Sequence, residues 1–240
     1  MTKQVPDPKR VANQVLATLS PQDYRRIEAQ LELVTLDFGQ VLYEPGKPIR
    51  HVYFPIDCLI SLLTAVDKRR TLEVGMVGNE GMAGMPFILG IGVSGVRAIV
   101  QGKGTALRMG SAPFRIEFDR NAALQNALYR YTYALMAQIS QTAACNRFHD
   151  AEARLSRWLL MTRDRVDSDE FLLTHEFLAH MLGVRRTTVS LSAHALQTAG
   201  LIRYARGKIK IVNREGLKES ACECYEVIRE HIDRAVPPLS

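Results

Sequence analysis

The sequence lacks an apolar run long enough to cross a membrane. Its longest apolar stretch, residues 58–66, contains a serine and a threonine, and it is far shorter than the roughly 18 to 20 residues that a hydrocarbon span needs. The first ten residues hold Lys3, Asp7, Lys9 and Arg10 without an apolar core, so they do not have the pattern of a secretory signal. These absences predict a cytoplasmic protein that has no membrane partner.

Cysteine is also scarce, with four among 240 residues. In a chain without a secretory signal, such cysteines are expected to be free thiols in a reducing compartment. Cys222 and Cys224 form a close pair, but the sequence shows no second ligand pair that would complete a zinc site, and no N-terminal cysteine cluster for an iron–sulfur centre. The sequence therefore predicts no metal and no cofactor, and it disfavours redox or metal sensing.

Histidine is rare in the segment that has the texture of a β domain. Between residues 34 and 109, short β-branched and aromatic stretches such as 41–43, 51–54 and 97–100 alternate with turn residues, which is typical of an antiparallel sandwich or barrel. A metal-dependent enzyme on such a roll needs two or three imidazoles and a carboxylate, but the segment holds only His51. We therefore predict no catalytic residues and no enzyme; a β-roll enzyme or ligand-binding module is the weaker alternative.

A long helix is predicted from about residue 121 to residue 148. Its apolar positions recur at steps typical of a helical seam: Leu124, Leu128, Tyr131, Leu135 and Thr142. Such a helix is roughly 40 Å long, which is more than a small β domain easily buries. We expect the stripe to form the seam of a two-fold homodimer. Packing against the sheet of the same chain is the alternative.

The positive charge of the chain is concentrated in one segment. Residues 171–214 hold seven basic side chains and one acidic side chain, and the remainder is balanced, so this segment accounts for the whole net charge of +6. A phosphate backbone attracts such a localised charge. A solvated positive face without a partner is the alternative.

The same segment has the pattern of a winged helix-turn-helix. Thr174 is placed to cap a first helix, Gly183 permits a left-handed turn, and a second helix begins near Arg186. The inward positions of the two helices are Leu178, Ala179, Leu182, Val189, Ser192, Ala193 and Leu196. Stretches 201–204 and 208–211 flank Arg206-Gly207, which predicts a two-stranded hairpin.

The order of these parts resembles the Crp/Fnr superfamily of bacterial transcription regulators. The most specific stretch runs from Ala153-Arg154-Leu155 through Leu182-Gly183-Val184-Arg185-Arg186-Thr187-Thr188-Val189-Ser190 to Ala199-Gly200-Leu201-Ile202 and the 207–208 hairpin. The resemblance covers nearly the full chain and implies an α+β fold. Its parts are N-terminal helices with an antiparallel, jelly-roll-like β-roll (1–112), a connecting and dimerisation helix (113–148) and a C-terminal winged helix-turn-helix (149–240).

The resemblance also implies function and partners. A member of this family is a sequence-specific, DNA-binding transcription regulator that acts as a homodimer on double-stranded DNA. RNA polymerase and an unidentified small-molecule effector are further candidate partners. Within this interpretation, a cyclic-nucleotide-activated regulator with an altered pocket is the main alternative.

Two departures from the family pattern shape the predicted sites. Members that bind cyclic nucleotides carry Gly-Glu and then Arg-Ser/Thr-Ala, where the acid holds the ribose hydroxyl and the arginine holds the cyclic phosphate. The corresponding effector-pocket residues here are Gly84, Met85, Val96, Arg97 and Ala98. Methionine cannot accept the hydroxyl proton, and Arg97 is displaced by one position, onto the opposite face of a strand. We therefore predict that the β-roll does not bind cyclic AMP in the usual way.

The second departure lies in the recognition helix, where the family's typical Arg-Glu-x-x-x-Arg is Arg186-Thr187-Thr188-Val189-Ser190-Leu191. Helical spacing directs Thr187, Ser190, Leu191, His194 and Thr198 away from the buried Val189 face, and Arg186 can contact a guanine edge or a phosphate. The predicted base-reading residues are Arg186, Thr187, Ser190, Leu191 and His194. The residues predicted to contact the DNA backbone are Arg185, Thr188, Arg203, Arg206, Lys208 and Lys210. The loss of the glutamate and the second arginine predicts an operator that differs from the family's usual palindrome.

Overall fold

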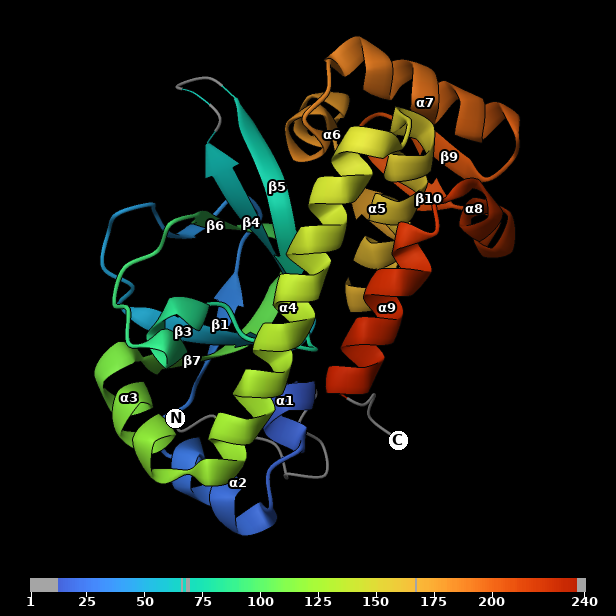
Figure 1. Ribbon diagram of the computed structural model, residues 1–240. Helices are drawn as coiled ribbons and strands as arrows, with labels where there is room; N and C mark the ends of the chain where they lie inside the picture. The colour runs from blue at the N-terminus through green and yellow to red at the C-terminus, as the bar shows by residue number, and fades with distance from the viewer. Residues whose placement is uncertain (1–12, 66, 68–69, 167, 237–240) are drawn as a thin grey trace.

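The computed structural model describes residues 13–65, 67, 70–166 and 168–236. Figure 1 shows three parts in chain order: an N-terminal β domain, the long helix α4 beside it, and a helical C-terminal part whose helix α7 lies at the far end from α2. Among the described residues, no helix is both long and apolar enough to span a membrane.

The β domain consists of two antiparallel sheets, as the sequence predicts. One has the strand order β1 (Glu32–Leu36), β7 (Gly104–Gly110), β3 (His51–Pro55); the other has the order β2 (Val41–Tyr43), β6 (Arg97–Gly102), β4 (Leu59–Ala65), β5 (Thr71–Val77). The apolar run of the sequence is β4. Alternate residues of that strand face opposite ways: Ile60 and Leu62 pack in the interior of the roll, whereas Leu59 and Leu63 pack against the C-terminal part.

Short helices precede, interrupt and follow the strands of the β domain. They are α1 (Gln14–Ala17), α2 (Pro21–Glu28), the 3-10 helix η2 (Met85–Leu89) and α3 (Ser111–Arg120). As expected for a proline-led helix, Ser20 caps α2, because its Oγ accepts a hydrogen bond from the Asp23 N–H at 3.1 Å. The sequence also predicts a short helix around residues 11–19; α1 lies within this range, and residues 11 and 12 lie outside the described part of the chain.

The long helix α4 (Ala122–Phe148) has the predicted bounds, and Asn121 caps it by accepting a hydrogen bond from the Leu124 N–H at 3.0 Å. All five residues of the predicted dimer seam are nevertheless buried within the single chain: Leu124, Leu128, Tyr131, Leu135 and Thr142. The first four belong to the core of the β domain. This corrects the assignment of the seam, because a side chain buried in its own subunit cannot contact a second one.

A different stripe of α4 is exposed to solvent. Tyr129, Tyr133 and Met136 leave 50%, 49% and 64% of their surfaces accessible, and exposed Ser140 and Ala143 continue the same spacing. Helix α9 (Cys224–Ala235) runs beside α4 (Figure 1), and the Tyr133 hydroxyl lies 3.0 Å from His231 Nδ1 of that helix. The exposed stripe is therefore the face of α4 that a partner could reach.

The C-terminal part begins with α5 (Ala151–Val166), which is buried on nearly every side. After it come β8 (Glu170–Leu172), α6 (His175–Leu182), α7 (Arg186–Thr198), β9 (Ile202–Ala205), β10 (Lys208–Ile211) and α8 (Arg214–Ser220). The predicted hairpin is β9–β10, and β8 adds a third strand in the order β8-β10-β9. Trp158 of α5 is part of the core.

A buried carboxyl group connects α5 to the β domain. Glu73 of β5 accepts hydrogen bonds from the Ser61 hydroxyl at 2.6 Å and from the Trp158 indole N–H at 2.9 Å. Burial raises the pKa of Glu73 from 4.5 to about 7, although both hydrogen bonds oppose the shift. The folded protein therefore holds a proton at Glu73 that the unfolded chain has already lost near neutral pH.

This raised pKa predicts a pH dependence of stability. The favourable contribution of protonated Glu73 is fully present below about pH 4.5 and is lost as the pH rises through about 7. The free energy of unfolding should therefore fall by an amount on the order of 2 kcal/mol between pH 5 and pH 8 because of this group. Urea unfolding at both pH values measures it. In Glu73→Gln this part of the decrease should disappear, and an unchanged pH dependence would contradict the assignment.

Candidate nucleic-acid interface

The helix-turn-helix forms as its local sequence dictates. Thr174 caps α6, with its hydroxyl oxygen accepting from the Phe177 N–H at 3.1 Å, and Gly183 adopts φ = 63° in the turn. A Cβ at Gly183 would also lie 2.6 Å from Leu72 of β5. Helix α7 begins at Arg186, and its buried residues are those predicted: Val189, Ser192, Ala193 and Leu196. The opposite face of α7 is thus directed away from the core.

Four of the five predicted base-reading residues are exposed on α7: Arg186, Thr187, Leu191 and His194. Leu191 leaves 72% of its surface accessible. The fifth residue, Ser190, is only partly accessible, and its hydroxyl lies 2.8 Å from His175 Nδ1 and donates to the Arg186 carbonyl at 3.1 Å. The structure therefore brings together one cationic, two polar and one apolar side chain on a single helical face.

The wing carries the predicted cations. Arg206 and Gly207 have φ values of 50° and 76°, which is the geometry of a two-residue type I′ turn. Arg203, Arg206, Lys208 and Lys210 are all exposed. The ammonium groups of Lys208 and Lys210 both pair with the Glu170 carboxylate of β8, Lys210 at 3.1 Å. These hydrogen bonds and charges lower the pKa of Glu170, which therefore stays ionised as a counter-charge inside the wing.

Three residues that the sequence did not indicate hold the wing against α7. The rings of His175 and Tyr204 stack with centroids 4.2 Å apart. The Tyr204 N–H donates to Gln197 Oε1 of α7 at 2.7 Å. Burial, and to a lesser extent the Arg186 charge, lower the pKa of His175. The stack of His175 on Tyr204 joins α6 to the wing across a long stretch of sequence, which no local pattern reveals, whereas Gln197 and Tyr204 are close in sequence and join the end of α7 to β9.

The remaining backbone-contact candidates lie at the start of α7. Arg185 is its exposed N-cap residue, and Thr188 is half-buried one turn further on. Arg185 and the wing together contribute five exposed cations to this surface of the molecule. They are Arg185, Arg203, Arg206, Lys208 and Lys210.

The residues predicted to line an effector pocket are mostly part of the core. Met85 and Ala98 are buried there, and Val96 packs against it. Gly84 adopts φ = 114°, and a Cβ at this position would lie 2.8 Å from Val52 Cγ1. Arg97 instead pairs with Glu44, Nε to Oε2 at 2.8 Å, with both side chains about 40% exposed. Its guanidinium is thus already held by a carboxylate.

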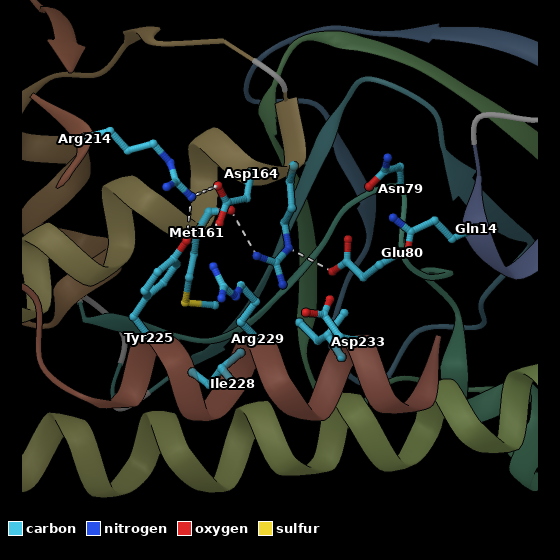
Figure 2. A pocket seen from close by; sticks show the side chains of 12 residues that line it. Gln14, Asn79, Glu80, Met161, Asp164, Arg214, Tyr225, Ile228, Arg229 and Asp233 are labelled. Atoms are coloured by element: carbon cyan, nitrogen blue, oxygen red, sulfur yellow. Dashed lines mark hydrogen bonds and ion pairs between the residues drawn. The ribbon is translucent and has the colours of Figure 1, made fainter. Parts of the chain in front are cut away.

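A separate pocket of about 230 Å³ lies where the β domain, α5, α8 and α9 meet. Figure 2 shows Glu80 on one wall and Tyr225, Arg229 and Asp233 of α9 on another. Glu80 pairs with Arg165 at 2.8 Å, both side chains being almost completely buried. Asp164 accepts from the Tyr225 hydroxyl at 2.6 Å. The walls are therefore ionic, with their main charges already paired.

Cys222 and Cys224 have neighbours that their sequence context did not show. No disulfide joins the four cysteines. The sulfur atoms of Cys145, Cys222 and Cys224 and a ring nitrogen of His149 all lie within 4.8 Å of one another. Cys145 and His149 are thus the second ligand pair, which the sequence next to Cys222 and Cys224 lacks.

Comparison with known proteins agrees with this architecture. Residues 153–220 match the Crp-like helix-turn-helix domain. A CRP-family transcriptional regulator from Thermus thermophilus, TTHB099, is 18% identical; the match covers 78% of this chain and 96% of that one, with a TM-score of 0.66. TTHA1359, a CRP/FNR-family regulator from the same organism, is 21% identical over 79% and 98% of the two chains, with a TM-score of 0.64.

A third solved structure, FixK2 from Bradyrhizobium japonicum, is 13% identical over 80% of this chain and 98% of that one, with a TM-score of 0.64. No curated protein matches the sequence. The fold and the exposed recognition helix define a winged helix-turn-helix protein with a cyclic-nucleotide-binding-like β domain. The chain has the Crp/Fnr transcription-regulator fold, and residues 153–220 form its Crp-like helix-turn-helix domain.

Proposed function

We propose that this protein is a sequence-specific, DNA-binding transcription regulator that acts as a homodimer and catalyses no reaction. The observation that carries the proposal is the exposed face of α7 beside the cationic wing. Arg186, Thr187, Leu191 and His194 project from a helix whose other face is buried. A helix of this kind fits the major groove, where each base pair presents a distinct pattern of donors, acceptors and methyl groups.

The proposed roles follow from the chemistry of each side chain. Arg186 offers a bidentate donor to a guanine edge, and Leu191 offers an apolar contact to a thymine methyl group. Ser190 is assigned to positioning, because its hydroxyl is held by His175. The exposed cations Arg185, Arg203, Arg206, Lys208 and Lys210, together with Thr188, would contact phosphates and fix the register without reading sequence.

The homodimer is proposed to form through the exposed stripe of α4, Tyr129, Tyr133, Met136, Ser140 and Ala143. These residues recur at steps of four and three, as two helices packed along a common seam require. A two-fold axis through this seam would present two copies of α7, one from each subunit, to the same DNA duplex. Two recognition helices about 34 Å apart enter successive major grooves on one side of the duplex.

The β domain is proposed to be a sensory domain that does not bind cyclic AMP in the usual way. Met85 offers no acceptor for a ribose hydroxyl, and it is buried in the core. Arg97, the nearest candidate for a cyclic phosphate, is paired with Glu44 near the surface. An effector of this domain would therefore need contacts other than those of the cyclic-nucleotide pattern.

Replacing Arg186 by alanine tests the proposed reading of bases. The loss of one bidentate contact in each half-site should weaken binding to the preferred operator by about 1–3 kcal/mol per half-site, or roughly 5- to 150-fold for each of the two. Binding to unrelated duplexes should change much less. Fluorescence anisotropy with both duplexes gives the two affinities. Arg26→Ala, an exposed arginine on α2 at the opposite end of the molecule, is the control. An equal loss on both duplexes would show that Arg186 contacts only the backbone.

A further inference from the structure

Four potential metal ligands converge where α4 and α9 meet. Cys145 Sγ lies 3.4 Å from Cys222 Sγ, and Cys224 Sγ lies 3.4 Å from His149 Nδ1. All four donor atoms lie within 4.8 Å of one another. The three cysteines are buried, and His149 is half-buried. The cluster lies outside the proposed DNA-binding surface.

The two pairs of donors come from distant parts of the sequence. Cys145 lies in the last turn of α4, and His149 is the C-cap of that helix, four residues further on and therefore on the same side. Cys222 and Cys224 flank Glu223 where α9 begins. Because α4 and α9 lie side by side (Figure 1), the end of one helix faces the start of the other.

We propose that Cys145, His149, Cys222 and Cys224 form a structural zinc site. Zinc in structural sites is tetrahedral, with bonds of about 2.3 Å to sulfur and 2.0–2.1 Å to nitrogen, so its donors lie about 3.5–3.8 Å apart. The observed separations of 3.4 Å and the 4.8 Å limit of the cluster bracket that value. Three thiolates and one imidazole are a donor set that favours zinc over magnesium or calcium. Because the protein supplies all four ligands, no position is left for substrate.

Neighbouring side chains already orient the ligands. The Nε2 atom of His149 lies 3.2 Å from the Glu223 carboxylate, so a proton on Nε2 leaves Nδ1 free to face the sulfur atoms. Metal-binding histidines are commonly fixed by a carboxylate in this way. The Gln141 side-chain amide donates to Cys224 Sγ at 3.1 Å. These contacts are what a metal site requires around its ligands.

Buried positive charge next to the cluster gives independent support. Arg154 and Arg157 are 6% and 4% exposed, and no ion pair with a carboxylate joins either one within the described part of the chain. Both interact electrostatically with Cys145 and Cys222, and Arg157 also interacts with Glu73. Buried cations need nearby negative charge. Three thiolates, one neutral imidazole and Zn²⁺ carry a net charge of −1, whereas four neutral side chains carry none.

A disulfide between Cys145 and Cys222 explains less of the structure. It would use two of the four donors and would give no role to Cys224, His149 or the Glu223 contact. The zinc site uses all of them. It would also tie the end of α4 to α9 next to residue 150, where the chain turns into α5. Under the proposed function, this clamp would fix the DNA-binding part relative to α4.

Metal content of the purified full-length chain tests the proposal directly. We expect about one zinc per chain by mass spectrometry of the bound metal. Replacement by Co²⁺ should give the intense visible absorption of a tetrahedral site and a sulfur-to-cobalt charge-transfer band. Cys145→Ser and Cys222→Ser should lose both signals. Cys58→Ser, a buried cysteine of the β domain, is the matched control and should keep them.

Two further variants sharpen the test. His149→Cys should retain the metal as a four-cysteine site. Glu223 is largely exposed, so Glu223→Gln should fold normally and weaken zinc binding by about 10- to 100-fold in competition with a chromogenic chelator. Absence of zinc from the reduced wild-type chain after incubation with excess Zn²⁺ would overturn the proposal. So would a non-reduced chain lighter by two hydrogens, which indicates a disulfide. DNA binding is not used as a readout, so the zinc proposal and the proposed function fail separately.

Discussion

Raising the salt concentration from about 50 to 200 mM is expected to weaken DNA binding by about three to five orders of magnitude. Each subunit exposes five basic side chains around α7: Arg185, Arg203, Arg206, Lys208 and Lys210. Two subunits can therefore make about six to ten phosphate contacts, each of which releases a condensed counterion. Fluorescence anisotropy on one duplex across a salt series measures the slope of log affinity against log salt.

Variants of the wing link this slope to particular residues. The double variant Lys208→Ala with Lys210→Ala should reduce the magnitude of the slope by about two to four for the dimer and weaken binding to all sequences alike. Glu170→Gln removes the carboxylate that pairs with both lysines, and it should strengthen binding to every duplex. A flat salt response of the wild type would show that this surface does not contact DNA phosphates.

Replacing Met136 by glutamate is expected to separate the dimer and to lower DNA affinity by about three orders of magnitude. Met136 is 64% exposed at the middle of the exposed α4 stripe. Two-fold symmetry would bury the new carboxylate twice without a partner, which costs several kcal/mol. A separated monomer keeps one recognition helix, so its affinity should fall from the range of specific complexes toward that of non-specific ones.

The measurement combines analytical ultracentrifugation with DNA titration. Ile116→Glu is a matched control, because Ile116 is an exposed apolar residue on α3 outside the stripe, with 50% of its surface accessible. It should leave both the mass in solution and the DNA affinity unchanged. If the Met136→Glu protein remained dimeric, the exposed stripe of α4 would not be the dimer contact.

The elements best predicted from the sequence are those specified by local chemistry. Thr174 caps α6, and it makes the hydrogen bond that its place in the sequence predicts. Gly183 has the positive φ that its place in the turn requires. The sequence predicts helix α7 together with its four buried residues. The capping residue, the glycine of the turn and the spacing of the apolar residues all lie within one short segment of the chain.

The dimer seam could not be assigned from the same kind of pattern. Helix α4 carries two stripes of similar spacing, one through Leu124 and Leu128 and one through Tyr129 and Tyr133. The more apolar stripe attracted the dimer assignment, but its hydrophobicity reflects burial against the β domain of the same chain. Only the fold shows which stripe is left for a partner.

The thiol cluster was missed for a different reason. Cys145 and Cys222 are 77 residues apart, and they meet only because α9 returns along α4. Taken alone, neither Cys145 with His149 nor Cys222 with Cys224 supplies the four ligands of a structural zinc site. The packing of α9, which no sequence motif predicted, is what joins them.

Selection from fragmented genomic DNA tests the central claim most directly. Wild-type protein should enrich fragments that share a two-fold symmetric motif, with half-sites about one helical turn apart and a sequence that differs from the family's usual palindrome. Fragments recovered with Arg186→Ala should share that motif only weakly. The absence of any enriched fragment, even at low salt, would contradict the assignment of α7 and the wing as a DNA-binding surface.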